Sequence, residues 1–532
     1  MTDPHRRFQQ GRFMLHGRPF LIVGGELHNS GSSTPSAIQR SLDAAVEIGV
    51  NTVLAPVAWE LIEPEEGGFY FAIVDALTSA ARDRGLHVIP LWFGTWKNGM
   101  STYVPQWVKQ DLRRFPRIHT AAGVAIEAIS PFSQSAREAD ARAFAALMRH
   151  FSEHDDGETV LMVQVENEVG VLGQARDHSP LATERWADPV PIEVLDAVRH
   201  SGAGRLWDAA QRSGDVEQQD WQTAFGEEAD EAFMATAYAS YLNEVAREGR
   251  AAFEVPLYAN AWVDANTEND GGETSFALGG GTQPGVYPSG GPLRHTASIW
   301  RALAPALDFL APDLYFGTFD AIAHEYASID GILFIPEMQC NRVGVEQMFR
   351  AVGELKAAGV APFAFDLMGK EDPHFADVKD AYRLLTAVGR VLAEYPGAEM
   401  HGFTLTETDP TRRLFIDGSL EVTRNHLAEI FPTPRNGVGC IARVAEDEYF
   451  VIGRGFAIRA LNPAGRRAGW LSVEEVECGT DEWEVRRRLN GDEIGGGEWI
   501  RLPAIEQLQS EAFPIRQNTE TTGVLRVRTY VY

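Results

Sequence analysis

VLMVQVENEVG, residues 160–170, begins as an apolar run and turns polar abruptly at its carboxyl end, with Gln164, Glu166, Asn167 and Glu168. The apolar part is typical of a parallel strand that is covered on both faces. Unpaired carboxylates are costly to bury, so packing explains the polar end poorly. We therefore predict a buried parallel strand whose last side chains point into a site. The alternative is a solvated loop start with capping residues.

Seven further apolar runs, rich in Val, Ile and Leu, lie between about Phe20 and Tyr395, and amphipathic helices separate most of them. Eight strand–helix alternations over this length predict a (β/α)8 TIM barrel, an α/β fold, rather than an open doubly wound sheet. The open alternative is weakened because no GxGxxG follows the first strand and no GxxxxGKS/T occurs. We predict strands near residues 20–25, 51–57, 87–92, 160–166, 255–260, 308–315, 331–337 and 361–366.

The clearest helix begins at Thr34, a capping residue that precedes a proline at the first helical position, and it ends at Gly49. Ile38 and Leu42 belong to its apolar stripe. Apolar periodicity and terminal glycines predict further helices near 72–84, 135–153 and 344–358.

Two insertions, near 171–230 and 263–293, interrupt the alternation after the carboxyl ends of strands, where barrels place their sites. We expect the second, glycine-rich insertion to form part of a substrate rim, with a flexible linker as the alternative. After about residue 396 the chain changes to short alternating runs such as YFVIGRGFAIRAL at 449–461, which are typical of strands with one buried face. We predict a catalytic barrel over 1–395 and a sandwich-like antiparallel β domain over 396–532.

The chain has 532 residues, with 47 Lys plus Arg against 75 Asp plus Glu, and a formal net charge of −28. This acidity argues against a nucleic-acid binder and against docking on an anionic membrane. No run of about 18 apolar residues occurs, so no membrane span is expected. A homo-oligomer stays open, because an acidic surface does not decide the oligomeric state.

The cysteines Cys340, Cys440 and Cys478 are far apart and no CxxC occurs, so the sequence predicts neither a disulfide framework nor a zinc-knuckle site. A reducing compartment fits this usage. We expect a cytoplasmic protein, or a periplasmic one if a signal segment was removed.

A second carboxylate ends another predicted strand. GILFIPEMQ, residues 331–339, is apolar up to Glu337. If these are the fourth and seventh strands of the barrel, Glu168 and Glu337 face one cavity from opposite walls. The alternative for Glu337 is an ion pair that closes the barrel. Two carboxyl groups across a cleft, one protonated and one ionised, are what glycoside hydrolysis needs.

The stretch 160–170 is similar to the strand-four signature of glycoside hydrolase family 35, the β-galactosidases of clan A. The resemblance extends upstream in the order and spacing of the family, through GGELHNS at 24–30, WELIEPEEGGFYF at 59–71 and TWKNGMSTYVPQW at 95–107. Glu60 and Ile62 stand where typical members have Asn and His, which indicates a divergent branch.

The resemblance implies a retaining mechanism in which Glu168 is the general acid/base and Glu337 the nucleophile. It also implies that Asn167 holds the sugar 2-hydroxyl, that Tyr315 hydrogen-bonds the nucleophile, and that Glu166 is a sugar ligand or supports one. The leading hypothesis is an exo-acting β-galactosidase that needs no cofactor or metal and acts on a β-galactoside or an oligosaccharide. Alternatives are a retaining β-glycosidase for arabinopyranosides or β-glucosides, a sugar-binding barrel without catalysis, and a scaffold.

Other side chains at predicted strand ends could complete a sugar site. Indole rings stack on the apolar face of a pyranose, although a single tryptophan is more often part of the core. Trp59, Trp92, Trp96 and Trp262 all lie at predicted strand ends; we favour Trp59 and Trp96 for this role and keep Trp262 as a further substrate-binding candidate. Polar candidates for sugar hydroxyls, with capping or surface roles as their alternatives, are Asn29, Glu60, Asn260 and Lys97.

Overall fold

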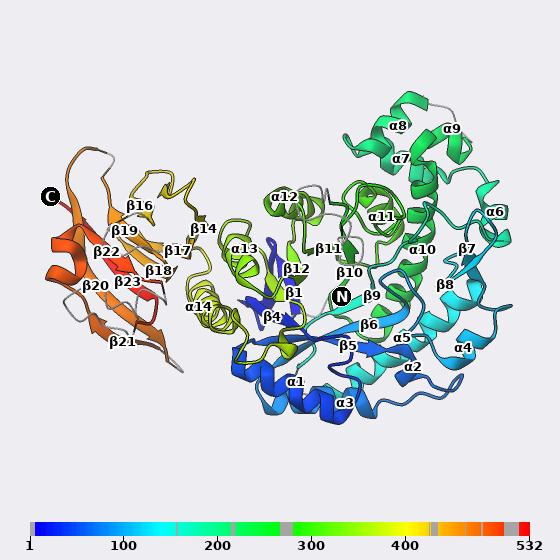
Figure 1. Cartoon of the computed structure of the whole chain (residues 1–532), viewed down its shortest axis with the longest axis horizontal. Helices are drawn as coiled ribbons and strands as arrows, with labels where there is room; N and C mark the ends of the chain where they lie inside the picture. Colours follow the sequence, from blue (N-terminus) through cyan, green and yellow to red (C-terminus); the bar gives the residue numbers. More distant parts are fainter. Residues whose placement is uncertain are drawn as a thin grey trace. The chain divides into compact units, whose positions relative to one another are not determined.

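The computed structural model describes residues 6–155, 158–213, 219–265, 280–424, 426, 435–462, 464–479, 482–504 and 521–532. Eight parallel strands form a closed barrel in the order β10-β11-β12-β13-β4-β5-β6-β9 (Figure 1). The predicted TIM barrel is thus confirmed. Its strands are β4 (Ile22–Glu26), β5 (Thr52–Ala58), β6 (His87–Lys97), β9 (Val163–Asn167), β10 (Leu257–Trp262), β11 (Phe309–Leu314), β12 (Phe334–Met338) and β13 (Gly359–Pro362).

Helices connect successive barrel strands, and Figure 1 shows α1 and α3 outside β4 and β5. The start of α1 is as the sequence predicts, because Thr34 Oγ1 accepts the N–H of Ala37 and Gly49 ends the helix in the left-handed region at φ 97°. The helices are α1 (Pro35–Ile48), α3 (Ala72–Asp83), α5 (Gln134–His154), α10 (Ala229–Ala252), α11 (Ala297–Leu303), α12 (Phe319–Asp330), α13 (Arg342–Gly353) and α14 (Phe375–Glu394).

The last barrel strand ends earlier than predicted. We expected a strand over 361–366, but β13 stops at Pro362 and a 3-10 turn, η3, follows at Phe365–Leu367. Ala364 between them has φ 56°, and a left-handed residue cannot continue a strand. The strand β6 differs in the other direction, since it continues to Lys97 instead of stopping near residue 92.

The first insertion is partly helical. Its described part holds α6 (Pro180–Trp186), α7 (Ile192–His200), α8 (Arg205–Ser213), α9 (Trp221–Phe225) and the turn η1 (Gly226–Glu228). Of the second insertion, residues 266–279 lie outside the described residues, and 280–293 hold isolated bridges only. One of these bridges pairs Val171 with Ser289, so the two insertions lie side by side there.

Short elements complete the barrel half of the chain. A three-stranded sheet of β1 (Arg6–Gln9), β2 (Arg12–Leu15) and β3 (Arg18–Pro19) precedes it, which the sequence did not predict. The remaining pieces are α2 (Trp59–Ile62), α4 (Gln106–Gln110), β7 (Arg117–His119) and β8 (Ala125–Ile129). Among the described residues, no helix is long and apolar enough to cross a membrane.

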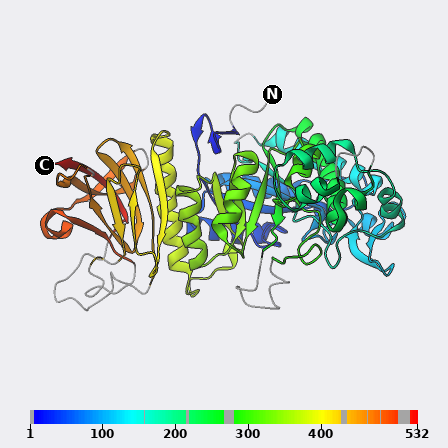
Figure 2. The same cartoon turned by 90° about the horizontal axis from the view of Figure 1, so that it is seen from above.

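The C-terminal part contains two antiparallel sheets, yellow to red in Figure 2, in the orders β14-β17-β18-β23-β20-β21 and β15-β16-β19-β22. Buried residues of both sheets share one core, for example Phe403, Val422, Val451 and Ile458, as the predicted sandwich requires. The elements are β14 (Glu399–Leu405), β15 (Thr411–Leu414), β16 (Leu420–Thr423), β17 (Gly437–Ala445), β18 (Glu448–Arg454), β19 (Phe456–Ala460), β20 (Ala468–Cys478), β21 (Trp483–Arg488), η4 (Gly491–Gly497), β22 (Trp499–Leu502) and β23 (Val524–Val531).

The chain divides into two compact units. The first comprises residues 1–10, 24–339 and 361–368, and the second comprises 11–23, 340–360 and 369–532. Within the second unit, α13 packs on β14 and β17, and α14 packs on β18. The division at residue 395 that we expect from the sequence stays a prediction.

Gly402 on β14 lies where α13 comes closest to the sheet. A Cβ there would meet the carbonyl oxygen of Phe349 and would lie 2.9 Å from the Cα of Gly353. We expect Gly402→Ala to lower the free energy of unfolding by about 1–3 kcal/mol, because the backbone must move apart. Calorimetric melting curves measure this. Gly397→Ala is the matched control, since a Cβ at Gly397 meets nothing within 4 Å. Equal melting of the two variants would contradict the close packing.

Candidate active site

Three carboxyl groups meet at the carboxyl ends of barrel strands. Glu168 directly follows β9, Asp313 lies near the end of β11, and Glu337 lies near the end of β12 as the register partner of Asp313. One oxygen atom of each carboxyl group lies within 4.8 Å of those of the other two. The barrel therefore brings the two predicted glutamates together, and it adds an aspartate that the sequence analysis did not single out.

Glu337 is surrounded by hydrogen-bond donors. The Tyr315 hydroxyl donates to its Oε2 at 2.9 Å, and the side-chain amide of Asn167 donates to its Oε1 at 3.2 Å. Asn260 Nδ2 lies 3.4 Å and Lys97 Nζ 3.9 Å from the same Oε1. These four groups hold the carboxyl group of Glu337 in one orientation, as a nucleophile requires.

Glu168 has different surroundings. Burial raises the pKa of Glu168 to about 7, the charge of Glu337 adds to this effect, and the charge of Lys97 opposes it. Asn98 is the side chain that donates to its Oε2. Because a carboxyl group with this pKa still holds a proton near neutral pH, Glu168 is equipped to act as an acid. The contrast with Glu337 is the division of roles that two-carboxylate catalysis requires.

The backbone at the end of β9 is strained. Glu166 has φ 61° and Glu168 has φ 44°, a region that residues with a side chain adopt at a cost of about 1–3 kcal/mol each. Asn260 holds this turn, because its Oδ1 accepts the N–H of Glu168 at 3.0 Å. Its Nδ2 also donates to Asp313 at 2.7 Å. Asn260 therefore connects the backbone of Glu168 with the carboxyl groups of Asp313 and Glu337.

Lys97 is buried among the carboxyl groups, so the surface-lysine alternative is wrong. Burial would lower the pKa of Lys97, but the charges of Glu337, Glu168 and Glu26 outweigh it and raise this pKa. The ammonium group also lies 5.2 Å from the centre of the Phe93 ring. Its position follows from the length of β6, which carries Lys97 into the barrel mouth beside Asn167, its register partner on β9.

Glu26 is a second residue that the sequence analysis missed. It ends β4, its exposed fraction is 0%, and neither carboxyl oxygen accepts a hydrogen bond from a described residue. Burial and then the charge of Glu337 raise the pKa of Glu26 well above its ordinary value. The available signal was a carboxylate inside an apolar run, FLIVGGE for Glu26 and FLAPDL for Asp313.

The tryptophans differ from expectation. Trp59 and Trp96 both have an exposed fraction of 0%, so neither offers a face to a sugar. Trp59 Nε1 donates to Glu63 at 2.8 Å, and Trp96 Nε1 donates to the carbonyl of Ile129 at 3.1 Å, which fixes both rings in the core. Trp92 is equally buried. Trp262 instead lines a small hollow together with Glu168, Asp313, Tyr315 and Phe316.

Three polar candidates lie outside the carboxyl cluster or serve the backbone. Glu166 has an exposed fraction of 0% and accepts the N–H groups of Thr95 at 3.0 Å and of Trp96 at 2.7 Å, so it holds the end of β6. Glu60 lies on α2 and pairs with Lys109 at 3.4 Å on a partly exposed surface. Asn29 is partly exposed, and its Oδ1 accepts no hydrogen bond from the described residues.

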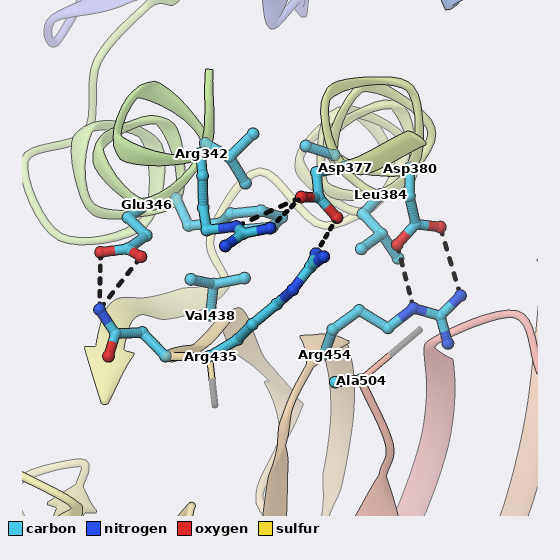
Figure 3. Close-up of a pocket in the computed structure, with 13 residues that line it drawn as sticks. Arg342, Glu346, Asp377, Asp380, Leu384, Arg435, Val438, Arg454 and Ala504 are labelled. Carbon is cyan, nitrogen blue, oxygen red and sulfur yellow. Dashed lines mark hydrogen bonds and ion pairs between the residues drawn. The ribbon is translucent and has the colours of Figure 1, made fainter. Parts of the chain in front are cut away.

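A separate pocket in the second unit is shown in Figure 3. Its charged side chains are already paired: Arg342 with Asp377 at 3.1 Å, Arg454 with Asp380 at 3.0 Å, and Arg435 with Asp377. The amide of Asn436 likewise donates to Glu346. Because these polar groups bind one another, they hold the helices α13 and α14 on the sheet, and the candidate site remains the barrel mouth.

Comparison with known proteins finds a likeness to one glycosidase family in the first half of the chain. Residues 12–264 match the model of glycosyl hydrolases family 35. A curated β-galactosidase of Xanthomonas manihotis is 31% identical over 190 residues, which cover 33% of this chain and 28% of the relative. This part of the chain is therefore similar to the domains of family 35. The match includes Glu168 and ends before Asp313 and Glu337. The closed barrel places these two residues, which lie outside the matched stretch, beside Glu168.

The remaining matches give no information about function. Residues 378–501 match the model "Domain of unknown function (DUF5597)". A catalytic mutant of a GH42 β-galactosidase from G. stearothermophilus is 16% identical, with a TM-score of 0.48, over 71% of this chain and 59% of that chain. The catalytic domain of a β-amylase from Paenibacillus polymyxa is 13% identical, with a TM-score of 0.47, over 68% and 97%. Likenesses at this level add nothing to the assignment. The chain spans less than a third of the length of the Xanthomonas relative.

Lys97 supplies the positive charge among these buried carboxyl groups, which leads to a prediction. Lys97→Met leaves negative charge uncompensated, and we expect the free energy of unfolding to fall by about 3–5 kcal/mol near pH 8. The loss should be smaller near pH 5, because protonation of neighbouring carboxyl groups replaces the missing charge. Denaturant titrations at both pH values measure it. Lys109→Met, which removes a partly exposed partner of Glu60, should change stability by no more than about 0.5 kcal/mol. An equal loss at both pH values would contradict the charge argument.

Proposed function

We propose that this protein is a retaining, exo-acting β-galactosidase that removes terminal β-D-galactosyl residues by double displacement. The observation that carries the proposal is the pair Glu168 and Glu337, whose nearest carboxyl oxygens lie within 4.8 Å and whose surroundings differ. Retaining glycosidases separate the two groups by about 5–5.5 Å, whereas inverting enzymes leave about 6.5–9.5 Å for a water molecule. The short separation supports the retaining course.

In the first step, a carboxylate oxygen of Glu337 bonds to C1 of the sugar while the bond from C1 to the leaving oxygen breaks. Glu168 gives its proton to that oxygen. In the second step, Glu168 takes a proton from water as the water oxygen attacks C1, and the bond to Glu337 breaks. Tyr315 and Asn260 hold Glu337 in place. Asn167 lies where it can bind the sugar 2-hydroxyl, as the family resemblance implies.

The sugar and the mode of attack are supported separately. The family 35 match and the name of the Xanthomonas relative point to a β-galactosyl group. Glu168 and Glu337 each have an exposed fraction of only 4%, and such a closed site suits the end of a sugar chain better than its interior. Trp262 is the indole positioned to face the sugar, because it lines the hollow beside Glu168. The expected substrate is a β-galactoside or an oligosaccharide with a terminal β-galactose.

A panel of aryl glycosides tests the sugar and the nucleophile together. We expect the β-galactoside to be cleaved faster than the α-arabinopyranoside, β-fucoside, β-glucoside and α-galactoside, and Glu337→Gln to lose this activity by several orders of magnitude. NMR of the first product should show the β-anomer. If another β-linked sugar is cleaved fastest, the galactosyl assignment is wrong. An α-anomeric first product would overturn the retaining mechanism.

The role of Glu168 has its own signature. Glu168→Ala should lower cleavage of a poor leaving group by about 10²–10⁴-fold, while the first step with a dinitrophenyl leaving group, which needs no proton, is spared. Azide should restore turnover and give a β-galactosyl azide. In the wild type, kcat/KM should fall as pH rises past about 7, because the acid loses its proton there. An equal loss on both leaving groups would exclude the acid role.

A further inference from the structure

Asp313 is the third carboxyl group of the site, and the double displacement described above assigns it no task. It is almost fully buried, with an exposed fraction of 2%. Its Oδ2 accepts from Asn260 Nδ2 at 2.7 Å, while its Oδ1 is buried and accepts no hydrogen bond from the described residues. Burying a carboxylate oxygen that accepts no hydrogen bond costs free energy. Protonation of Asp313 would remove this cost.

A protonated Asp313 has two neighbouring carboxyl groups to which it could donate a hydrogen bond. One carboxyl oxygen of Asp313 lies within 4.8 Å of one of Glu168 and one of Glu337. Glu337 already receives hydrogen bonds from Tyr315, Asn167 and Asn260. Glu168 receives one, from Asn98, so its carboxyl group has acceptor capacity left for a proton of Asp313.

We infer that Asp313 is a positioning residue that shares one proton with Glu168, so that a pair of carboxyl groups, and not Glu168 alone, supplies the proton of the reaction. This inference rests on the proposed function. While Glu337 is ionised, the two facing carboxyl groups keep one proton between them, because ionising both as well would place three like charges together.

The proton balance of the reaction fits a pair. Before the first step, Glu337 is ionised and the pair holds one proton, so the three carboxyl groups carry two negative charges. In that step the proton leaves with the departing oxygen, the pair becomes doubly ionised, and Glu337 becomes a neutral ester, so the charge is again two. In the second step, water returns a proton to the pair and Glu337 regains its charge. The total negative charge of the three carboxyl groups around Lys97 therefore stays constant through both steps.

The titratable groups around Asp313 come from several barrel strands and from α12. Burial is the largest cause that raises the pKa of Asp313 well above its ordinary value, and the nearby negative charges follow. A single positive charge, Lys97, opposes them among the described residues. The charged and titratable neighbours are Glu337, Glu168, Glu26, Lys97, Tyr258, Tyr315 and Tyr326.

The test compares the wild type with Asp313→Asn, which keeps an oxygen acceptor for Asn260. We expect the alkaline limb of kcat/KM to move by at least about one pH unit, because Glu168 then titrates without the carboxyl group that shares its proton. Above the new limb, the loss should be confined to substrates with poor leaving groups. The matched control is Asp83→Asn, an exposed aspartate on α3, which should leave the pH profile unchanged. A raised KM with an unmoved limb would overturn the inference, as would no change.

Infrared titration of the carboxyl C=O band gives a readout that needs no substrate. If one proton is shared, Asp313→Asn and Glu168→Gln should each lose the band at a lower pH than the wild type. Bands that titrate independently would overturn the sharing. If the wild type cleaves no β-glycoside, the proposed function fails while this titration still decides the proton. Should Asp313→Asn not fold, the smaller Asp313→Ser serves in both measurements.

Discussion

The barrel mouth holds more negative charge than positive, and much of the local structure follows from this constraint. Glu26, Glu168, Asp313 and Glu337 are all almost fully buried, and Lys97 is the buried cation among them in the described part of the chain. Buried ions are stable only when they are paired, hydrogen-bonded or protonated. Each device is used here: Lys97 supplies charge, amide and phenol groups supply donors, and protons neutralise what is left.

The strained end of β9 is explained by the same constraint. Glu166 and Glu168 lie on one short stretch, yet Glu166 must reach the backbone of β6 and Glu168 must reach the site. Left-handed φ values at both residues let the two side chains point in these different directions. Asn260 stabilises this backbone conformation by accepting the N–H of Glu168. The strain is offset by hydrogen bonds from a different strand, so the catalytic geometry depends on barrel closure.

Periodicity made the barrel predictable from the sequence. Eight apolar runs became eight strands because a strand covered on both faces must be apolar over its whole length. Glu168 and Glu337 were visible because each ends such a run. Trp59 and Trp96 were misjudged because a tryptophan at a strand end has the same sequence context whether its ring turns to the core or to the rim. Lys97 was misjudged because the length of β6, and not local composition, carries it into the mouth.

Asp313 and Glu26 show where sequence reasoning stops. Both interrupt apolar runs, which signals a buried carboxyl group but not its partner. For Asp313, the partner is set by register, since pairing with Glu337 across β11 and β12 places it beside a residue of another strand. A shift of one residue would turn its side chain to the other face of the sheet. The three carboxyl groups therefore come together only because the ends of three separate strands meet, and no single motif contains that information.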